Sequence, residues 1–545
     1  MLALMPPLMF GGLLIFTLIG FPVAFSLSAL GLFFGLISIQ LGLFDMGFLQ
    51  AIPLRVFGSV LSNDLLLAIP FFTFMGAVLE RCGLAEDMLD SMGQLFGTVR
   101  GGLGYSVILV GFILGAVTGT VAAQVMAMAM ISLPVMMRYK YNTRYATGVL
   151  AASGTITQLV PPSLVLVVLA DQLGKSVGDM YLGAWGPSVL QIALFASYTF
   201  MLSIVRPDWL PAMPKEHRTL QGWALWRKCL RGIVPSAVLI FLVLGTMMMG
   251  LATPTEAGAV GAIGAVVLAV LHHPELGRIS HRVFQVGVIA CGIGVAIRWL
   301  KVDPLFFKLA FAVTYLAVAW LCVRVLYLPD LRRLIVQAYQ STMRITAMVV
   351  FILIGSTCFA IVFQGVDGGL WIEHLLTGLP GGVWGFLIFI NLFIFCLAFF
   401  LDFFEIAFII LPLLAPVALK LLAPIVGADA ALIWFGVMVC VNMQTSFMHP
   451  PFGFALFYLR AVVPKEIKTS DIYWGAIPWV LLQLVMVGLV VAFPRIVTTL
   501  LPKASGIDPA TVEIVAPQED YRPEAEDSDE TIRRQFGEDP NKPAQ

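Results

Sequence analysis

Long apolar runs separated by short polar segments dominate this chain, and the length of each run predicts what it forms. A helix needs about 20 apolar residues to cross the hydrocarbon core of a bilayer, which is about 30 Å thick. The runs that fit this rule as ordinary spans are 8–39, 64–80, 183–205, 232–250, 254–271, 344–364 and 474–500. The pattern therefore predicts an all-α polytopic membrane protein.

Two other stretches are too long for a single crossing. Residues 103–137 carry no charge, and as one helix they would extend about 50 Å. The sequence GAVTGT at 115–120, rich in Gly and Thr, favours a turn in their middle, and DFFE at 402–405 interrupts the run 384–419 in the same way. Each stretch predicts a re-entrant helical hairpin. Irregular backbone at membrane depth is tolerated only against protein or water, so both tips should line a site.

Each hairpin is followed by an apolar segment broken by polar residues and a Pro-Pro pair. The first segment is AASGTITQLVPPSLVLVVL at 151–169, and the second contains NMQTSFMHPPFGF at 442–454. Pro-Pro removes two backbone donors and disfavours helix before it, which leaves carbonyl groups unpaired. We therefore predict two broken helices, near 145–170 and near 431–460.

These two regions read as copies of one another. Aligning Pro161-Pro162 with Pro450-Pro451 places Ser153 opposite Asn442 and Thr155 opposite Gln444, and GDMYLGA downstream matches SDIYWGA. Interrupted segments in corresponding positions of two halves indicate the binding site of a secondary transporter. An odd number of crossings between the halves would make the repeat inverted.

The same pattern gives a domain organisation. We expect a scaffold region at the N-terminus, two repeats separated by a basic loop with connecting helices, an inserted two-helix hairpin, and an acidic disordered tail. The boundaries are 1–63, 64–205 (first repeat), 206–271, 272–333 (insertion), 334–501 (second repeat) and 502–545. The first basic residue is Arg55, so the first apolar segment reads as a retained membrane helix rather than a cleaved signal peptide.

Composition excludes several function classes. The chain is 59% hydrophobic and 12% charged, against about 25% charged in soluble domains, and its mean hydropathy is +0.94. The seven cysteines include no CxxC pair and read as membrane-embedded apolar residues. There is no Walker A pattern, no G-x-S-x-G and no set of His, Cys or paired acids at metal-ligand spacing. Neither an enzyme nor a nucleic-acid-binding protein is indicated.

Several motifs, taken in order, carry a family resemblance. GAVTGT, ASGTITQLVPPS, TPTEAGAVGA, FLDFFEIAFIILPLLAP and VNMQTSFMHPPFGFALFYLR together resemble the large membrane subunit of tripartite ATP-independent periplasmic (TRAP) transporters, the DctM type. The likeness covers about 64–271 and 334–500. Phe403-Phe404 stand where this family commonly has Pro-Thr after an acid, and the insertion at 272–333 departs from the compact family pattern.

The resemblance implies a sodium-driven uptake system in the bacterial inner membrane. A periplasmic binding protein (DctP type) would deliver a small organic anion, typically a carboxylate. A small four-helix membrane subunit (DctQ type), here separate, would accompany the large subunit. A transport domain would move elevator-fashion against a scaffold, and no cofactor would be needed beyond sodium as the coupling ion.

Sodium is a hard cation that takes oxygen ligands, and unwound backbone at a helix break supplies them. We therefore assign candidate sodium ligands to the hairpin tip and the break of the first half and to the break of the second half. They are Thr118, Gly119, Thr120, Ser153, Gly154 and Thr155, and Asn442, Gln444, Thr445 and Ser446. The alternative is that these hydroxyl groups merely bond neighbouring helices.

A second set has predicted roles in substrate binding or ion coupling. It comprises two acids within an apolar run, a histidine beside the second proline pair, and the prolines themselves. These are Asp402, Glu405, His449, Pro161, Pro162, Pro450 and Pro451. Intramembrane acids are costly and usually functional; the alternatives are that both lie at a membrane boundary, or that they couple transport to protons. His449 can instead be a histidine satisfied within the fold.

The predicted function is sodium-coupled import of small organic acids by a binding-protein-dependent permease. The main alternative is a stand-alone sodium- or proton-coupled anion transporter that needs no binding protein. An intramembrane enzyme using Asp402 and His449 has no pairing of these residues in its favour. A passive channel fits poorly, because repeated broken helices suit alternating access better than a continuous pore.

Overall fold

The computed structural model describes residues 4–118, 120–214, 222–273, 278–299, 304–450 and 453–502, and in this part of the chain all regular structure is helical. Within it, ten helices are long and apolar enough to cross a bilayer, or twelve if each of two bent helix pairs is one span. The prediction of an all-α polytopic membrane protein is confirmed. The predicted tail, 502–545, forms a unit of its own, and its residues from 503 onward lie outside the described part.

The first half opens with long apolar helices. Residues 8–39, predicted as one span, form two helices, because Gly20 ends the first in a left-handed conformation (φ +96°) and Pro22 precedes the second. A bend of 49° then separates a short segment from the next long helix. The elements are α1 (Met5–Ile19), α2 (Val23–Gln40), α3 (Met46–Arg55), η2 (Val56–Leu61) and α4 (Asp64–Arg81).

The predicted hairpin and broken helix of the first half follow, joined to α4 by a short amphipathic helix. The helix before the proline pair ends in a tight 3-10 turn, and a new helix begins after it. The elements are α5 (Leu84–Phe96), the hairpin arms α6 (Gly102–Thr118) and α7 (Val121–Arg138), the broken helix α8 (Thr143–Thr155), η3 (Ile156–Gln158) and α9 (Leu164–Gln172), then α10 (Val177–Val205) and the turn η4 (Pro207–Trp209).

The second half repeats this order around the inserted helix pair. Its short connecting helix meets the first hairpin arm at 116°. The elements are α11 (Gly222–Met248), α12 (Pro254–His272), the inserted α13 (Arg278–Trp299) and α14 (Pro304–Tyr327), α15 (Pro329–Gly365), α16 (Gly368–Thr377), the hairpin arms α17 (Gly382–Leu397) and α18 (Phe403–Glu405) with η6 (Ile406–Ile410) and α19 (Leu411–Val426), the broken helix α20 (Ala428–Met443), η7 (Gln444–Phe447) and α21 (Phe454–Val462), then α22 (Thr469–Ala492) and α23 (Arg495–Thr498).

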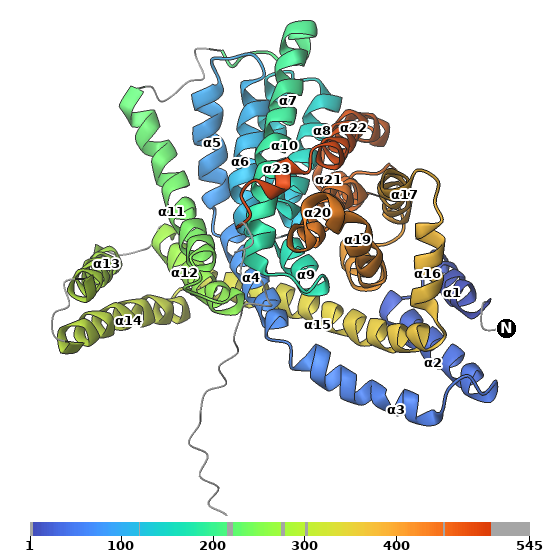
Figure 1. Ribbon diagram of the computed structural model, residues 1–545. Helices are drawn as coiled ribbons and strands as arrows, with labels where there is room; N and C mark the ends of the chain where they lie inside the picture. The colour runs from blue at the N-terminus through green and yellow to red at the C-terminus, as the bar shows by residue number, and fades with distance from the viewer. Residues whose placement is uncertain are drawn as a thin grey trace, which may run out of the picture. The chain divides into compact units, whose positions relative to one another are not determined.

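Contacts between the halves are reciprocal (Figure 1). Helix α2 packs on α15 while α4 packs on α12, and α8 packs on α22 while α10 packs on α20. The second part of each broken helix contacts the hairpin of the other half, α21 against α7 and α9 against α19. This exchange is the pattern expected of two copies related by a two-fold axis, and it interlocks the halves at the breaks.

The direction of the chain makes the repeat an inverted one. If the shorter apolar helix α1 and the broken helix each cross once, the first half has five crossings: α1, α2, α4, the broken helix and α10. The hairpin returns to the side from which it entered. An odd number of crossings starts the second half on the opposite side of the membrane. The broken helices lie in the interior, since 89% of the span formed by α20 and η7 is buried inside the protein, as unpaired backbone at membrane depth requires.

Candidate functional site

The first hairpin packs against the first break through two glycines one turn apart. A Cβ atom on Gly111 would lie 2.8 Å from Cβ of Ser153, and a Cβ on Gly115 would lie 3.1 Å from Cα of Thr157. Small residues at this spacing let two membrane helices approach to backbone contact. The tip of the first hairpin is therefore held directly over the unwound part of the first broken helix.

Gln124, on α7, the second arm of the first hairpin, stabilises this contact. Its Nε2 donates to the carbonyl oxygens of Gly111 (2.6 Å) and Ser153 (3.1 Å), and its side-chain oxygen accepts from the Thr157 hydroxyl. One buried amide thus joins both hairpin arms to the break. The Ser153 carbonyl, a candidate sodium ligand, is positioned by this bond.

Hydroxyl side chains brace the two breaks in the same way. Thr157 Oγ1 donates to the Gly154 carbonyl at 2.8 Å, and Ser446 Oγ donates to the Met443 carbonyl at 2.7 Å. The two residues occupy equivalent places in the repeat. Such bonds to the carbonyl three residues earlier satisfy groups that the end of a helix leaves unpaired.

Beyond the first break the chain turns at the proline pair. The Pro161-Pro162 peptide bond is cis, and Ser163 caps the next helix by accepting from the Val165 N–H at 3.2 Å. The Tyr181 hydroxyl, from the repeated Asp-x-Tyr-x-Gly-Ala motif, donates to the Ser163 carbonyl at 3.4 Å. At the second break Pro450 belongs to the described residues and Pro451 does not.

The second break is joined to its hairpin by a pair of asparagines. Asn442 Nδ2 donates to the carbonyl oxygen of Asn391 (2.7 Å) and to its Oδ1 (3.0 Å), while the Asn442 carbonyl accepts from Thr445 Oγ1 at 2.7 Å. Asn391 lies on the first arm, α17. Asn442 and Gln124 therefore play the same part in the two halves, each joining a hairpin to a break. Gln124 lies on the hairpin, whereas Asn442 lies on the broken helix.

The two breaks adjoin each other. Thr155 Oγ1 lies 3.8 Å from Met448 Sδ, and Cys440 Sγ lies 3.3 Å from the Gln158 carbonyl oxygen. Gln483, on α22, donates to Thr155 Oγ1 at 2.9 Å. The predicted ligands at Ser153, Gly154 and Thr155 thus share one buried region with those at Asn442, Gln444, Thr445 and Ser446.

Asp402 and Glu405 form a reciprocal capping box at the tip of the second hairpin. The Glu405 N–H donates to Asp402 Oδ1 (2.9 Å), and the Asp402 N–H donates to Glu405 Oε2 (3.0 Å). The capping box begins the second arm of the second hairpin and holds both carboxylates at that point. Thr253 and Glu256 make the same motif at the start of α12.

His449 lies between two aromatic rings at the second break. Its ring centroid is 4.2 Å from that of Phe399, to which it is stacked, and 4.2 Å from that of Phe395, which meets it edge-on. The side chain is 1% exposed. Among the described residues neither ring nitrogen has a hydrogen-bond partner, so the imidazole is packed but not satisfied.

Other buried polar atoms at the breaks share this condition. Unpaired buried polar groups are rare, and each costs about 1–3 kcal/mol. Within the described residues, the atoms without a partner include Ser153 Oγ, Asn442 Oδ1, Gln483 Oε1 and both side-chain amide atoms of Gln158, Gln191 and Gln444. The oxygens among these atoms are of the kind that a hard cation prefers as ligands.

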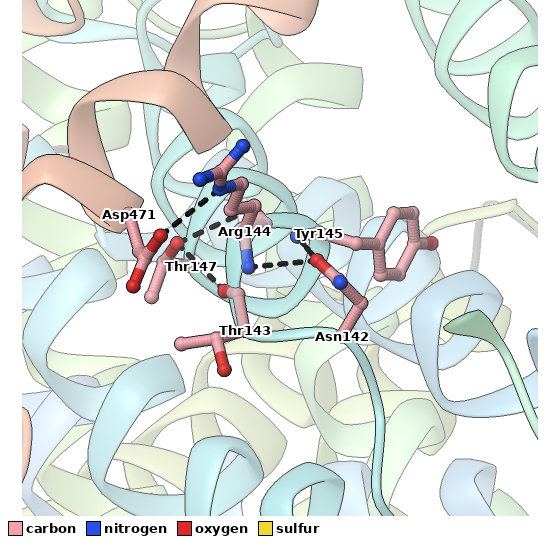
Figure 2. Close-up of polar contacts among 6 residues, drawn as sticks. All are labelled: Asn142, Thr143, Arg144, Tyr145, Thr147 and Asp471. Carbon is pink, nitrogen blue, oxygen red and sulfur yellow. Dashed lines mark hydrogen bonds and ion pairs between the residues drawn. The ribbon is translucent and has the colours of Figure 1, made fainter. Parts of the chain in front are cut away.

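The helices that carry the breaks are also held across the repeat. Arg144 Nε, at the start of α8, lies 2.9 Å from Asp471 Oδ1 at the start of α22, and the Asn142 side chain caps α8 through the N–H groups of Arg144 and Tyr145 (Figure 2). An equivalent ion pair joins the other two helices. Lys175 Nζ, just before α10, lies 3.9 Å from Asp429 Oδ1 at the start of α20. The Asp of the repeated motif in the second half therefore binds the broken helix of the first.

Some predicted positions lie outside these contacts, and some contacts were not predicted. Gly119 and the side chain of Thr118 are outside the described residues, while Thr120 precedes α7 and is half-buried. Four residues of the site were not predicted from the sequence pattern: Gln124, Asn391, Gln191 and Gln483. A longer alignment signals the last two, because Gln191 and Gln483 stand at equal distances after the matched Asp179 and Asp471.

The family model of the DctM component of tripartite ATP-independent periplasmic transporters matches residues 10–302 and 306–496. The chain belongs to the DctM family. It is 27% identical to the C4-dicarboxylate TRAP transporter large permease protein DctM of Pseudomonas aeruginosa, with 83% of this chain and 90% of the relative covered. The corresponding protein of Rhodobacter capsulatus is 25% identical, with 90% and 97% covered.

DctM relatives with other substrates in their names align over similar lengths. The sialic acid TRAP transporter large permease protein SiaM of Vibrio cholerae is 25% identical, with 89% of this chain and 95% of the relative covered. Among solved structures, the YdaH transporter of Alcanivorax borkumensis matches with a TM-score of 0.50 and 16% identity, over 83% of this chain and 89% of that chain; this likeness concerns the fold alone. As a TRAP large permease, the protein is a component of the inner membrane.

Proposed function

We propose that this DctM protein imports small organic carboxylates with sodium coupling, by an elevator movement. It would act as the large subunit beside a four-helix membrane subunit of the DctQ type and a periplasmic binding protein of the DctP type. Several relatives named for C4-dicarboxylates support a dicarboxylate as the first substrate to test.

The observation that carries the sodium assignment is the group of buried, unpartnered oxygens at the two breaks. In the first half, ligands would come from Ser153, Gly154 and Thr155, with Thr118, Gly119 and Thr120 at the hairpin tip. In the second half they would come from Asn442, Gln444, Thr445 and Ser446. The Ser153, Asn442 and Gln444 side-chain oxygens are buried without a partner among the described residues, and a bound cation would supply the missing interaction.

Substrate binding and coupling are assigned to the neighbourhood of the second hairpin tip. Asp402 and Glu405 fix its start, and His449 is packed against Phe395 and Phe399 from the same hairpin. A substrate carboxylate could accept a hydrogen bond from an imidazole N–H that has no partner among the described residues. The proline pairs Pro161-Pro162 and Pro450-Pro451 would keep the backbone unwound at this depth.

The elevator mechanism is supported by the division of contacts. The hairpins and broken helices interlock across the repeat, whereas α2, α4, α12 and α15 make their most extensive contacts with one another and fewer with the hairpins and broken helices. The first group would move as one body, and the second would form the stationary scaffold. The short connecting helices α5 and α16 would link them.

Reconstitution tests the proposal. The protein is placed in proteoliposomes with its small subunit and supplied with substrate-loaded binding protein, and uptake is compared under inward sodium and potassium gradients. We expect accumulation only with sodium, and Thr155→Ala and Asn442→Ala should weaken the sodium dependence more than they lower expression. Thr342→Ala is the matched control, since Thr342 is a buried threonine that bonds to its own helix through the Ala338 carbonyl.

The same assay separates the alternatives. Uptake that persists without the binding protein would identify a stand-alone anion transporter. Uptake driven by a pH gradient in the absence of sodium would assign proton coupling instead. Equilibration without accumulation would indicate a channel, and each of these results would contradict the proposed function.

A further inference from the structure

A cavity of about 680 Å³ lies where three membrane-spanning helices end on the same side of the membrane. Its walls come from the last turn of α4, the last turn of α12 and the first turns of α15, with one residue from α5. A second cavity of about 430 Å³ adjoins it and shares Arg333 and Gln337. This paired cavity is distant in sequence from both hairpin tips and is not used by the proposed transport site.

The charges around the paired cavity favour an anion. Arg81 and Arg333 line the larger part, and Arg332 lines the smaller part. Arg81 donates to the Gln337 side chain (2.8 Å), a neutral partner. In the described part of the chain, Arg332 and Arg333 are exposed and their side chains have neither a hydrogen-bond nor an ion-pair partner. Their guanidinium groups can form paired hydrogen bonds with phosphate oxygens.

Two acids also line the larger cavity, and they do not cancel these charges. Asp87 Oδ2 lies 3.5 Å from His272 Nε2, and Asp330 belongs to the first turn of α15, where the helix dipole favours an acid. Three arginines against two acids leave an excess of one positive charge with the histidines neutral. That excess matches the single negative charge of a phosphodiester.

The depth of the paired cavity is that of lipid headgroups. The apolar run of α4 ends at Leu79 and is followed by Glu80 and Arg81, and that of α12 stops at His272. The Arg81–Gln337 bond sets the level of α15 beside them. Arg333 lies one helical turn before Gln337, about 6 Å further from the membrane centre. Lipid headgroups lie at roughly this distance beyond the edge of the hydrocarbon core.

The outer face of α15 continues from the arginines as an apolar stripe. Val336, Tyr339 and Met343 follow Arg332 at helical spacing and are 47%, 57% and 49% exposed. Their direction along α15 leads toward the hydrocarbon core. A charged headgroup site joined to an exposed apolar stripe that includes a tyrosine fits a phospholipid better than it fits a free ion.

We propose that this paired cavity binds the phosphate headgroup of an anionic phospholipid, with its acyl chains along Val336, Tyr339 and Met343. Arg332 and Arg333 bind the phosphate, and Arg81 fixes the cavity wall. Basic pockets between membrane helices are known to take such headgroups. The lipid is a structural ligand of α15, which packs on both α2 and α4.

Native mass spectrometry of the full-length protein tests this site. The detergent-solubilised protein is offered equimolar phosphatidylglycerol and phosphatidylcholine, and retention of each is measured. The variant Arg332→Gln/Arg333→Gln should lose the preference for phosphatidylglycerol, with affinity at least about tenfold weaker. Arg227→Gln/Arg231→Gln removes two exposed arginines near the start of α11 and should bind like the wild type.

Inorganic phosphate is the second arm of the experiment. If millimolar phosphate displaces phosphatidylglycerol, the site holds a free anion and the proposal is wrong. Equal retention of phosphatidylglycerol by the wild type and Arg332→Gln/Arg333→Gln also overturns the proposal. So does a result in which this double variant retains the lipid normally and loses only its association with the small membrane subunit. Should the double variant fail to fold, Arg332→Gln alone carries the test, because Arg332 is exposed and has no described partner to lose.

Discussion

Gly148 and Gly475 lie in backbone contact where α8 of the first half crosses α22 of the second. A Cβ atom on Gly148 would lie 2.2 Å from the Gly475 carbonyl oxygen, and one on Gly475 would lie 2.2 Å from the Arg144 carbonyl oxygen. Gly475 is the glycine of the repeated Asp-x-Tyr-x-Gly-Ala motif. Its counterpart, Gly183, meets Ile433 and Val437 of the other broken helix, so the motif marks the crossing in both halves.

Gly475→Ala should therefore separate α8 from α22. Overpacking of a close contact costs about 1–3 kcal/mol, and we expect a lower melting temperature together with loss of uptake. Gly488→Ala is the control on the same helix, because a Cβ there meets no atom within 4 Å. Thermal unfolding in detergent measures both variants, and equal behaviour would contradict the crossing described here.

Asp402→Asn separates the capping role of this residue from a role of its charge. Asparagine caps a helix as well as aspartate does, so the second hairpin arm should keep its start and the melting temperature should change little. If the carboxylate takes part in coupling, sodium-driven uptake should fall at least about tenfold, because acids within membrane segments are usually functional. Glu256→Gln, in the other capping box, is the control and should transport normally.

Normal uptake by Asp402→Asn would leave Asp402 with a capping role alone. In that case Asp402→Ala should still lower stability by about 1 kcal/mol, the usual cost of losing an N-cap.

Gln483→Leu removes the donor that holds the Thr155 hydroxyl at 2.9 Å. The sodium concentration for half-maximal uptake should rise about two- to tenfold, the equivalent of one hydrogen bond. Stability should change little, because the substitution also removes Oε1, which has no partner in the described part of the chain. An unaltered sodium response would refute the proposed role of Gln483.

His449→Leu tests whether the imidazole serves transport or packing. The buried nitrogens cost stability while they have no partner, so a leucine of similar size between Phe395 and Phe399 should keep or raise the melting temperature. If the imidazole binds substrate, uptake should fall at saturating sodium. A destabilised variant with normal uptake per folded molecule would assign His449 to packing.

The repeat and its breaks could be predicted from sequence because each depends on local chemistry. Pro161-Pro162 and Pro450-Pro451 forbid continuous helix wherever they occur, and runs as long as 103–137 exceed one crossing whatever surrounds them. The same locality explains one error, since Gly20 and Pro22 divide 8–39 into two helices although hydropathy shows no gap there.

The partners of the site residues could not be predicted in this way. Thr155 and Gln483 are 328 residues apart in sequence, and Gln124 reaches Ser153 only because Gly111 permits the hairpin to approach. The hydropathy pattern indicates neither of these two contacts, because a single glutamine barely changes the mean hydropathy of an apolar run. The matched positions of Gln191 and Gln483 are an exception, and a longer comparison of the two halves reveals them.

The crossing of the halves has a consequence for how the protein is made. The ribosome adds about 5–20 residues per second, so the 328 residues between Thr155 and Gln483 take about 16–65 s to synthesise. During that time the first broken helix is in the membrane without α22, the helix that covers its polar turn. Insertion must therefore shelter a half-built protein, and a chain interrupted before α22 would expose that turn to the cell's quality-control proteases.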